Sequence, residues 1–113
     1  MERKLIYVAH PFGGDGKNRE RLRKEIADMV GRMHDADKYI FLNPLDLFIS
    51  VANVHDDDTI LRQCVDLLKR CDGVIFCGNW HKSRGVRLEH LVSSILDMRR
   101  WEGTDAFLAN HEF

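Results

Sequence analysis

One carboxylate of this 113-residue chain stands where it could act as a nucleophile. Glu89 follows the polar residues 79–84 and falls in the first turns of a helix that apolar spacing predicts over residues 85–101. At about 100° per residue it lies at the border of the helix's apolar face, half-shielded from water. The helix dipole tends to keep such a carboxylate ionised, which suits a nucleophile better than a general acid. The alternative is a glutamate that only satisfies the helix dipole and the solvent.

Three other features carry groups that could serve the same chemistry. Tyr7 lies late in a predicted strand, where its hydroxyl could orient a carboxylate; the alternative is a core tyrosine with a solvated tip. Gly13, Gly14 and Gly16 precede a helix and could wrap a phosphate or a sugar in backbone N–H groups, or form a plain turn. Trp80 lies in a loop and could stack on a base or simply pack.

The elements that must position these residues are short apolar runs alternating with stretches of helical spacing. Strands are predicted at residues 5–9, 39–42, 73–77 and, at the edge of the sheet, 106–109. Helices are predicted at residues 18–33, from the acids at 56–58 to residue 71, and at residues 85–101. Residues 45–55 are expected to form a loop with at most a helical turn.

This alternation predicts an α/β fold, a three-layer α/β/α sandwich with a flavodoxin-like parallel sheet of about four strands in the order 2-1-3-4. We expect a single domain over residues 1–113. In such a sheet, ligands bind at the carboxyl ends of the strands, near the point where the strand order reverses. Residues 9–17, 43–58 and 78–84 meet there, and the polar and glycine residues of the chain concentrate in them.

Charge and composition exclude several classes of protein. Seventeen Lys and Arg against eighteen Asp and Glu give a net charge of −1, so we expect no nucleic-acid polymer as partner. No apolar run is long enough to span a membrane. Three cysteines without a C-x-x-C pair fit buried thiols in a reducing cytoplasm, and six histidines without an H-x-x-x-H pair argue against a metal site. A thin sheet with an exposed edge favours a homodimer.

Four stretches of the chain form a specific combination. They are I-Y-V-A-H-P at residues 6–11 with the glycines that follow, Asn43-Pro44, L-L-K-R-C-D at residues 67–72, and G-N-W-H-K-S-R-G-V-R-L-E at residues 78–89. Together they make nearly the whole chain resemble the nucleoside 2-deoxyribosyltransferase-like superfamily, including its small phage and bacterial branches. The last stretch is similar to that superfamily's G-W-x-x-S-x-G-x-x-x-E signature, with Asn79 inserted.

The resemblance implies hydrolysis or transfer at the N-glycosidic bond of a nucleoside or nucleoside monophosphate, with no cofactor. It implies that Glu89 attacks the anomeric carbon, that Tyr7 orients the carboxylate, and that Ser83 helps to hold sugar or phosphate. The substrate-binding residues expected on this basis are His10, Pro11, Gly13, Gly14, Asn43, Trp80, Ser83 and Gly85.

The chain departs from the superfamily at the group that assists the leaving base. Relatives commonly have an aspartate eight residues before the Asp at the start of the third strand, and counting back from Asp72 gives Cys64. A thiol with an ordinary pKa of about 8.5 is a poor acid for this step. Asp57, one heptad earlier and nearer the site, is the expected catalytic substitute, whereas Asp66 should face the solvent.

Other functions stay open on these residues. The acid missing at Cys64 supports a second hypothesis, a module that binds a nucleotide without cleaving it. Lys82 and Arg84 stand where relatives have a further acid, and these cations would suit a ligand that carries phosphate. A structural or protein-interaction role is a third hypothesis, because a fold alone does not determine a function.

Overall fold

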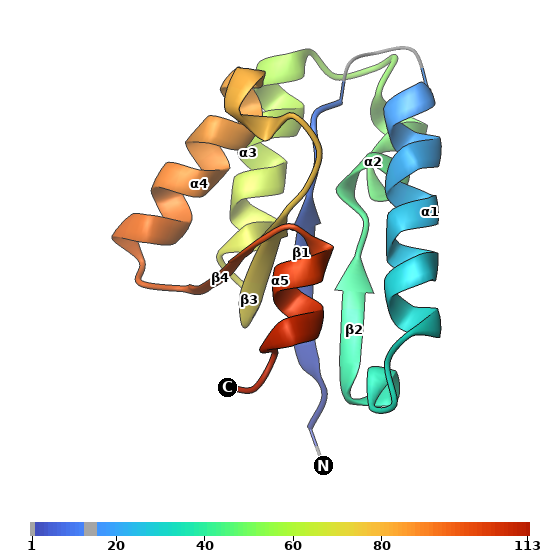
Figure 1. The fold of residues 1–113 in the computed structure, drawn as a ribbon. Helices are drawn as coiled ribbons and strands as arrows, with labels where there is room; N and C mark the ends of the chain where they lie inside the picture. The colour runs from blue at the N-terminus through green and yellow to red at the C-terminus, as the bar shows by residue number, and fades with distance from the viewer. Residues whose placement is uncertain (1, 13–15) are drawn as a thin grey trace.

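The computed structural model describes residues 2–12 and 16–113, and strands and helices alternate along them (Figure 1). The strands are β1 (Lys4–Ala9), β2 (Tyr39–Leu42), β3 (Gly73–Phe76) and β4 (Arg99–Glu102). The α-helices are α1 (Lys17–Gly31), α2 (Pro44–Leu47), α3 (Asp57–Leu68), α4 (Arg84–Ile95) and α5 (Thr104–Ala109). Short 3-10 helices at Ala36–Lys38, Ile49–Val51 and Trp80–Lys82 lie in the connections.

The strands form one parallel sheet in the order β2-β1-β3-β4, which confirms the predicted topology. β1 lies inside the sheet, where its Tyr7 is in register with Leu42 of β2 and Val74 of β3. The chain order reverses between β1 and β3. In an open parallel sheet this reversal point, at the carboxyl ends of the strands, is where a ligand site is expected.

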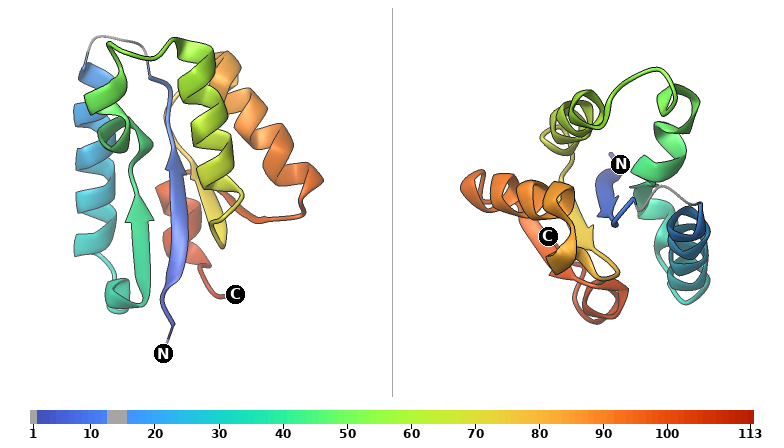
Figure 2. Two further views of the ribbon diagram at one scale, coloured as in Figure 1. Left: turned by 180° about the vertical axis from the view of Figure 1, so that it is seen from behind. Right: turned by 90° about the horizontal axis from the view of Figure 1, so that it is seen from above.

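Helices cover both faces of the sheet (Figure 2). α1 and α5 pack over the face that carries Ile6, Val8 and Ile75. α3 and α4 pack over the opposite face, which carries Tyr7 and Val74. Because successive residues of a strand point to opposite faces, the register of β1 directs Tyr7 toward α3 and α4.

Short polar side chains define where two of these helices begin. Asp56 Oδ1 accepts a hydrogen bond of 2.7 Å from the backbone N–H of Thr59, so α3 begins at the run of acids, as predicted. Ser83 Oγ accepts a hydrogen bond of 3.3 Å from the backbone N–H of Val86 at the start of α4. A side-chain cap of this kind contributes about 1 kcal/mol, and both caps lie next to the carboxyl edge of the sheet.

The C-terminal part of the chain differs from the prediction. The helix predicted over residues 85–101 ends at Ile95, because Asp97 adopts a left-handed φ of 53°, which an α-helix cannot accommodate. Residues 99–102 form β4, in which Trp101 is buried between two exposed neighbours. The edge strand predicted at residues 106–109 is wrong, since these residues belong to α5.

The wrong assignment has a physical reason in the pattern of burial. A short apolar run such as residues 106–109 fits a strand or a helix equally well, and only its packing decides. Gly103, at a φ of 91°, turns the chain out of β4, and α5 then folds back so that Phe107 is fully buried. Residues 45–55 hold more helix than expected, in α2 and the 3-10 helix after it. No described helix is both long enough and apolar enough to cross a membrane.

Phe107→Ala should lower the free energy of unfolding by about 3–5 kcal/mol, because the buried ring packs edge-on against Tyr39, Phe41 and Trp101. The matched control is Phe113→Ala, which removes an exposed ring near the same cluster and should lower it by less than about 1 kcal/mol. Urea unfolding followed by tryptophan fluorescence measures both. Two equally small losses would contradict the packing of α5 on the sheet.

Candidate active site

A cavity of about 560 Å³ lies at the carboxyl end of β1, between α3, α4 and the segment that starts at α2. Six of the predicted catalytic and substrate-binding residues line this cavity: Tyr7, His10, Asp57, Ser83, Gly85 and Glu89. Much of the remaining wall is apolar and comes from α2, α3 and the residues between them. The structure therefore brings the predicted nucleophile and its predicted orienting phenol to the same cavity.

Glu89 is a buried carboxylate on the wall of the cavity, with only 5% of its surface exposed. Burial raises its pKa from 4.5 to about 7, while the nearby Tyr7 hydroxyl opposes the rise. The sequence indicated a half-shielded group kept ionised by the helix dipole, and this part of the interpretation is wrong. Glu89 is the sixth residue of α4, and the dipole acts mainly within the first turn, so desolvation dominates.

Tyr7 lies beneath Glu89 and is fully buried in β1. Burial, followed by the negative charge of Glu89, raises the pKa of the phenol well above its ordinary value, so the hydroxyl keeps its proton. The hydroxyl lies close enough to Glu89 and Cys64 to influence their pKa values. The Tyr7 hydroxyl and Glu89 Oε2 nevertheless lack a well-formed hydrogen bond within the described chain. A buried donor and a buried acceptor are thus left with capacity for a ligand.

Cys64 forms part of the same wall, on the side of α3 that faces Tyr7. Burial raises the pKa of its thiol to about 11, although the contact with Tyr7 acts in the opposite direction. The side chain is therefore a neutral thiol at neutral pH. It can pack against a ligand but is a poor donor of a proton to one.

Asp57 also lines the cavity. It is the first residue of α3 and its side chain is exposed. Seven residues separate it from Cys64, which corresponds to about 10 Å along the helix axis. The structure thus places the predicted substitute acid on the cavity wall, but two turns of helix away from the thiol that it would replace.

The loop after β3 and the start of α4 form another part of the wall. Gly85 lies against α3, where a Cβ on this residue would be 3.4 Å from Leu61 Cδ1, about an ordinary van der Waals contact. His10 is buried, and its Nδ1 lies 2.9 Å from the backbone oxygen of Pro11. Its ring packs against Gly78, whose φ of 65° and lack of a side chain are both required there, because a Cβ would lie 2.8 Å from His10 Nε2.

A second hollow of about 420 Å³ adjoins the cavity and shares His10, Phe12 and Ser83 with it. Its other lining residues include Pro11, Asn18, Arg21, Glu25, Asn79 and Lys82. The wall of this hollow therefore holds two cationic side chains and two side-chain amides but only one carboxylate. Sequence analysis missed Asn18 and Arg21, because their place on the exposed side of α1 gives no signal without the fold.

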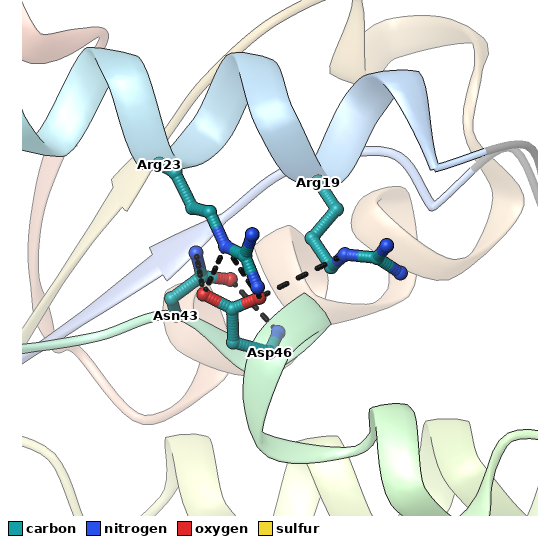
Figure 3. A network of polar contacts seen from close by, with 4 residues as sticks. All are labelled: Arg19, Arg23, Asn43 and Asp46. Carbon is teal, nitrogen blue, oxygen red and sulfur yellow. Dashed lines mark hydrogen bonds and ion pairs between the residues drawn. The ribbon is translucent and has the colours of Figure 1, made fainter.

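Asn43 does not line either space, although it was predicted to bind substrate. Its Oδ1 accepts a hydrogen bond of 3.1 Å from the backbone N–H of Asp46 and so begins α2. The Asp46 carboxylate in turn accepts two bonds of 2.9 Å from Arg23 Nε, and Arg19 lies 3.9 Å away (Figure 3). This network connects α1 to α2 and thereby fixes Pro44 and Leu45 in the cavity wall.

The other predicted binding residues lie elsewhere. Trp80 lines neither space; its ring packs on Phe76 and stacks on His90 at a centroid distance of 4.4 Å. Gly13 and Gly14 lie outside the described residues. Phe48, Ala52, Ile60 and Leu61 line the cavity and were not predicted. In the sequence, these apolar residues could not be told from core residues.

Comparison with known proteins finds a matching family and a similar solved structure. The family model described as "Domain of unknown function (DUF4406)" matches residues 4–99. A solved structure, the 2-desoxiribosyltransferase from Leishmania mexicana, superimposes with a TM-score of 0.59 at 19% identity, covering 86% of this chain and 61% of that one. The resemblance stated from the sequence is thus confirmed for the fold, over about three fifths of that protein's length. No curated protein sequence matches the chain.

The burial of Glu89 should make the stability of the protein depend on pH. The folded protein holds a proton on Glu89 up to about pH 7, whereas the unfolded chain releases it near 4.5. Because the folded state binds more protons in this interval, its stability should fall as the pH rises through it and level off above. Glu89→Gln removes this dependence, so the difference in unfolding free energy between the two proteins should change by roughly 3 kcal/mol from pH 4 to pH 8, in favour of the variant at high pH. Urea unfolding across that range measures it, and a constant difference would contradict the burial.

Proposed function

Since the chain belongs to the DUF4406 family, whose description states no activity, we propose a function from the cavity itself: cleavage of the N-glycosidic bond of a nucleoside or nucleoside monophosphate, by hydrolysis or by base transfer. One observation carries this proposal. The carboxylate of Glu89 is buried, has an oxygen without a partner, and lies on the wall of a cavity large enough for a nucleoside, next to a protonated phenol. The printed name of the structural relative, a 2-desoxiribosyltransferase, supports the same reaction class.

In the proposed mechanism, Glu89 is the nucleophile. One carboxylate oxygen forms a bond to the anomeric carbon of the sugar as the bond from that carbon to the base breaks, and the electron pair of the broken bond leaves with the base. Water, or a second base, then attacks the glycosyl ester and releases the carboxylate. A carboxylate with a pKa of about 7 is more basic than an ordinary one, yet is largely ionised above neutral pH. When the ligand is bound, the Tyr7 hydroxyl donates a hydrogen bond that orients this carboxylate, and Tyr7 stays protonated throughout.

The walls of the two spaces suggest how a nucleotide binds. The apolar wall at Phe48 and Leu61 takes the base, while Ser83 and Gly85 lie beside the sugar. Arg21 and Lys82 in the adjoining hollow suit a 5′-phosphate. We keep the predicted roles in binding for His10 and Pro11, which line the adjoining hollow, and for Gly13 and Gly14.

A second candidate function is binding of a nucleotide without cleavage. The observation in its favour is the neutral thiol of Cys64 where relatives commonly have an aspartate. In this case calorimetry shows tight binding of a nucleoside monophosphate, and chromatography of the same sample detects no free base after many hours. Release of free base would eliminate this alternative.

The setting that we propose is a reducing cytoplasm with a small molecule as partner. Cys64, Cys71 and Cys77 are free thiols, and burial raises the pKa of each, so none is activated for oxidation. A cavity of about 560 Å³ is within the range of small-molecule sites. Both observations agree with an intracellular enzyme of nucleotide metabolism.

Glu89→Gln should reduce the release of free base from a panel of nucleoside monophosphates by at least about 1,000-fold, because an amide cannot form the glycosyl ester. The matched control is Glu112→Gln, which makes the same change at an exposed residue of the C-terminal tail. Liquid chromatography of the free base measures the rates of all three proteins. The proposed function fails if the native protein and Glu89→Gln release base at the same rate.

We also propose that the protein is a homodimer that pairs through α4. Leu88, Leu91 and Ile95 share the outer face of this helix, where Leu91 is 55% and Ile95 72% exposed. The stripe is self-complementary, because an antiparallel second copy centred near Leu91 brings Leu88 of one copy close to Ile95 of the other. The two-fold pairing therefore covers the exposed apolar side chains of both copies.

Leu91→Glu should convert this dimer to a monomer, because it places two carboxylates at the two-fold axis. Sedimentation equilibrium of the native protein and the variant at micromolar concentrations measures the change. Exposed Asp66→Glu on α3 serves as the control and should leave the mass unchanged. A native protein that sediments as a monomer would refute the proposed pairing.

A further inference from the structure

The charged side chains that line the described part of the cavity are mostly acidic. The cavity wall holds three carboxylates, those of Asp57, Asp58 and Glu89, and one guanidinium, that of Arg84. Arg84 is already engaged, since its Nη2 lies 3.2 Å from Asp58 Oδ1. A negative, largely apolar cavity attracts a cationic ligand and repels an anionic one.

No described group on the wall close to Glu89 is acidic enough to give a proton to a leaving base. Burial and the charge of Glu89 raise the pKa of the Tyr7 phenol well above its ordinary value. Cys64 holds a thiol with a pKa of about 11, and its apolar neighbours Ile60 and Leu61 carry no acidic proton. Asp57 is about 10 Å further along α3. His10 Nδ1 lies 2.9 Å from the backbone oxygen of Pro11, and the His10 ring packs against Gly78.

This arrangement restricts which bases can leave. When an uncharged base departs, the electron pair of the glycosidic bond makes it an anion, which must be protonated for the reaction to be fast. A base that already carries a fixed positive charge becomes neutral when it takes the same electron pair. Such a base needs no acid, and its charge complements the carboxylates of the cavity until the bond breaks.

We propose that the preferred substrates are N-glycosides of a base with a fixed positive charge, namely pyridinium or N7-alkylated purine nucleosides and their 5′-phosphates. This proposal rests on the function proposed above. An oxygen of Glu89 bonds to the anomeric carbon, the bond from that carbon to the ring nitrogen breaks, and the electron pair neutralises the ring. Water then hydrolyses the glycosyl ester, which yields the free sugar or sugar phosphate, the Glu89 carboxylate and a proton released to the solvent.

The same cavity offers a surface for such a ring. Phe48 lines the apolar wall, and the face of an aromatic side chain attracts a cation that is removed from water. The phosphate of a mononucleotide extends instead toward Arg21 and Lys82 in the adjoining hollow. The two spaces thus separate the positive base from the negative phosphate of one ligand.

The experiment compares pairs of substrates that differ in the charge of the base. 7-Methylguanosine 5′-monophosphate is matched with guanosine 5′-monophosphate, and nicotinamide mononucleotide provides the pyridinium source. Base release is followed by chromatography, and each kcat/KM is divided by the uncatalysed rate of that substrate. We expect the cationic substrates to exceed the uncharged one by at least about 100-fold on this scale, the size of effect that proton transfer to a leaving group supplies.

Two substitutions at one position test the physical cause. Cys64→Asp introduces an acid beside Glu89, whereas Cys64→Asn introduces a group of the same shape without an acidic proton. The preference for the cationic base should fall by at least about tenfold in Cys64→Asp and should not fall in Cys64→Asn. Circular dichroism and thermal melting establish that both variants are folded.

The outcomes separate this inference from the proposed function. Equal corrected rates for the charged and uncharged substrates, all abolished by Glu89→Gln, would overturn the inference and leave the function intact. An equal loss of preference in Cys64→Asp and Cys64→Asn would also overturn it. No release of base from any of these substrates would overturn both.

Discussion

The burial of one carboxylate is the constraint on which this structure depends. Taking an ionised carboxylate out of water is strongly unfavourable unless it is paired, and no described cation approaches Glu89. Its pKa therefore rises to about 7, so that the protein keeps a group that is partly neutral at rest and basic when ionised. A fold selected for stability alone would place an apolar residue there. An acid kept at this position, beside the equally unsatisfied hydroxyl of Tyr7, is typical of a site that completes its contacts with a ligand.

The rest of the fold holds this carboxylate in place. The parallel order of the sheet sets β1 inside it and directs Tyr7 to the face covered by α3 and α4. Ser83 caps the start of α4, and this helix carries Glu89 to the cavity wall beside the Tyr7 hydroxyl. The Asp46 network then connects α1 to α2 and closes the third side of the cavity.

The sequence predicted most of this arrangement because the governing signals are local. The buried strands, the capped start of α3 and the strand order follow from apolar runs, acids and chain alternation, and the pairing of Tyr7 with Glu89 in one cavity follows from them. The prediction extended a helix through the residues that form β4 and placed a strand where the chain forms α5, because residues 99–109 have no local pattern that distinguishes strand from helix. The turn at Asp97 and the burial of Phe107 determine which element forms. Asn43 and Trp80 were expected at the site, yet each serves packing or capping that only the fold reveals.

The pKa of Glu89 is the quantity that tests this account most directly. It can be measured by carbon-13 NMR of the side-chain carboxyl in protein labelled at glutamate, with Glu89→Gln to assign the signal. We predict a midpoint of about 7, which rises further in Tyr7→Phe because the phenol stabilises the ionised form. A midpoint near 4.5 that does not respond to Tyr7→Phe would show a solvated glutamate without a phenol beside it, and the account of the site would be wrong.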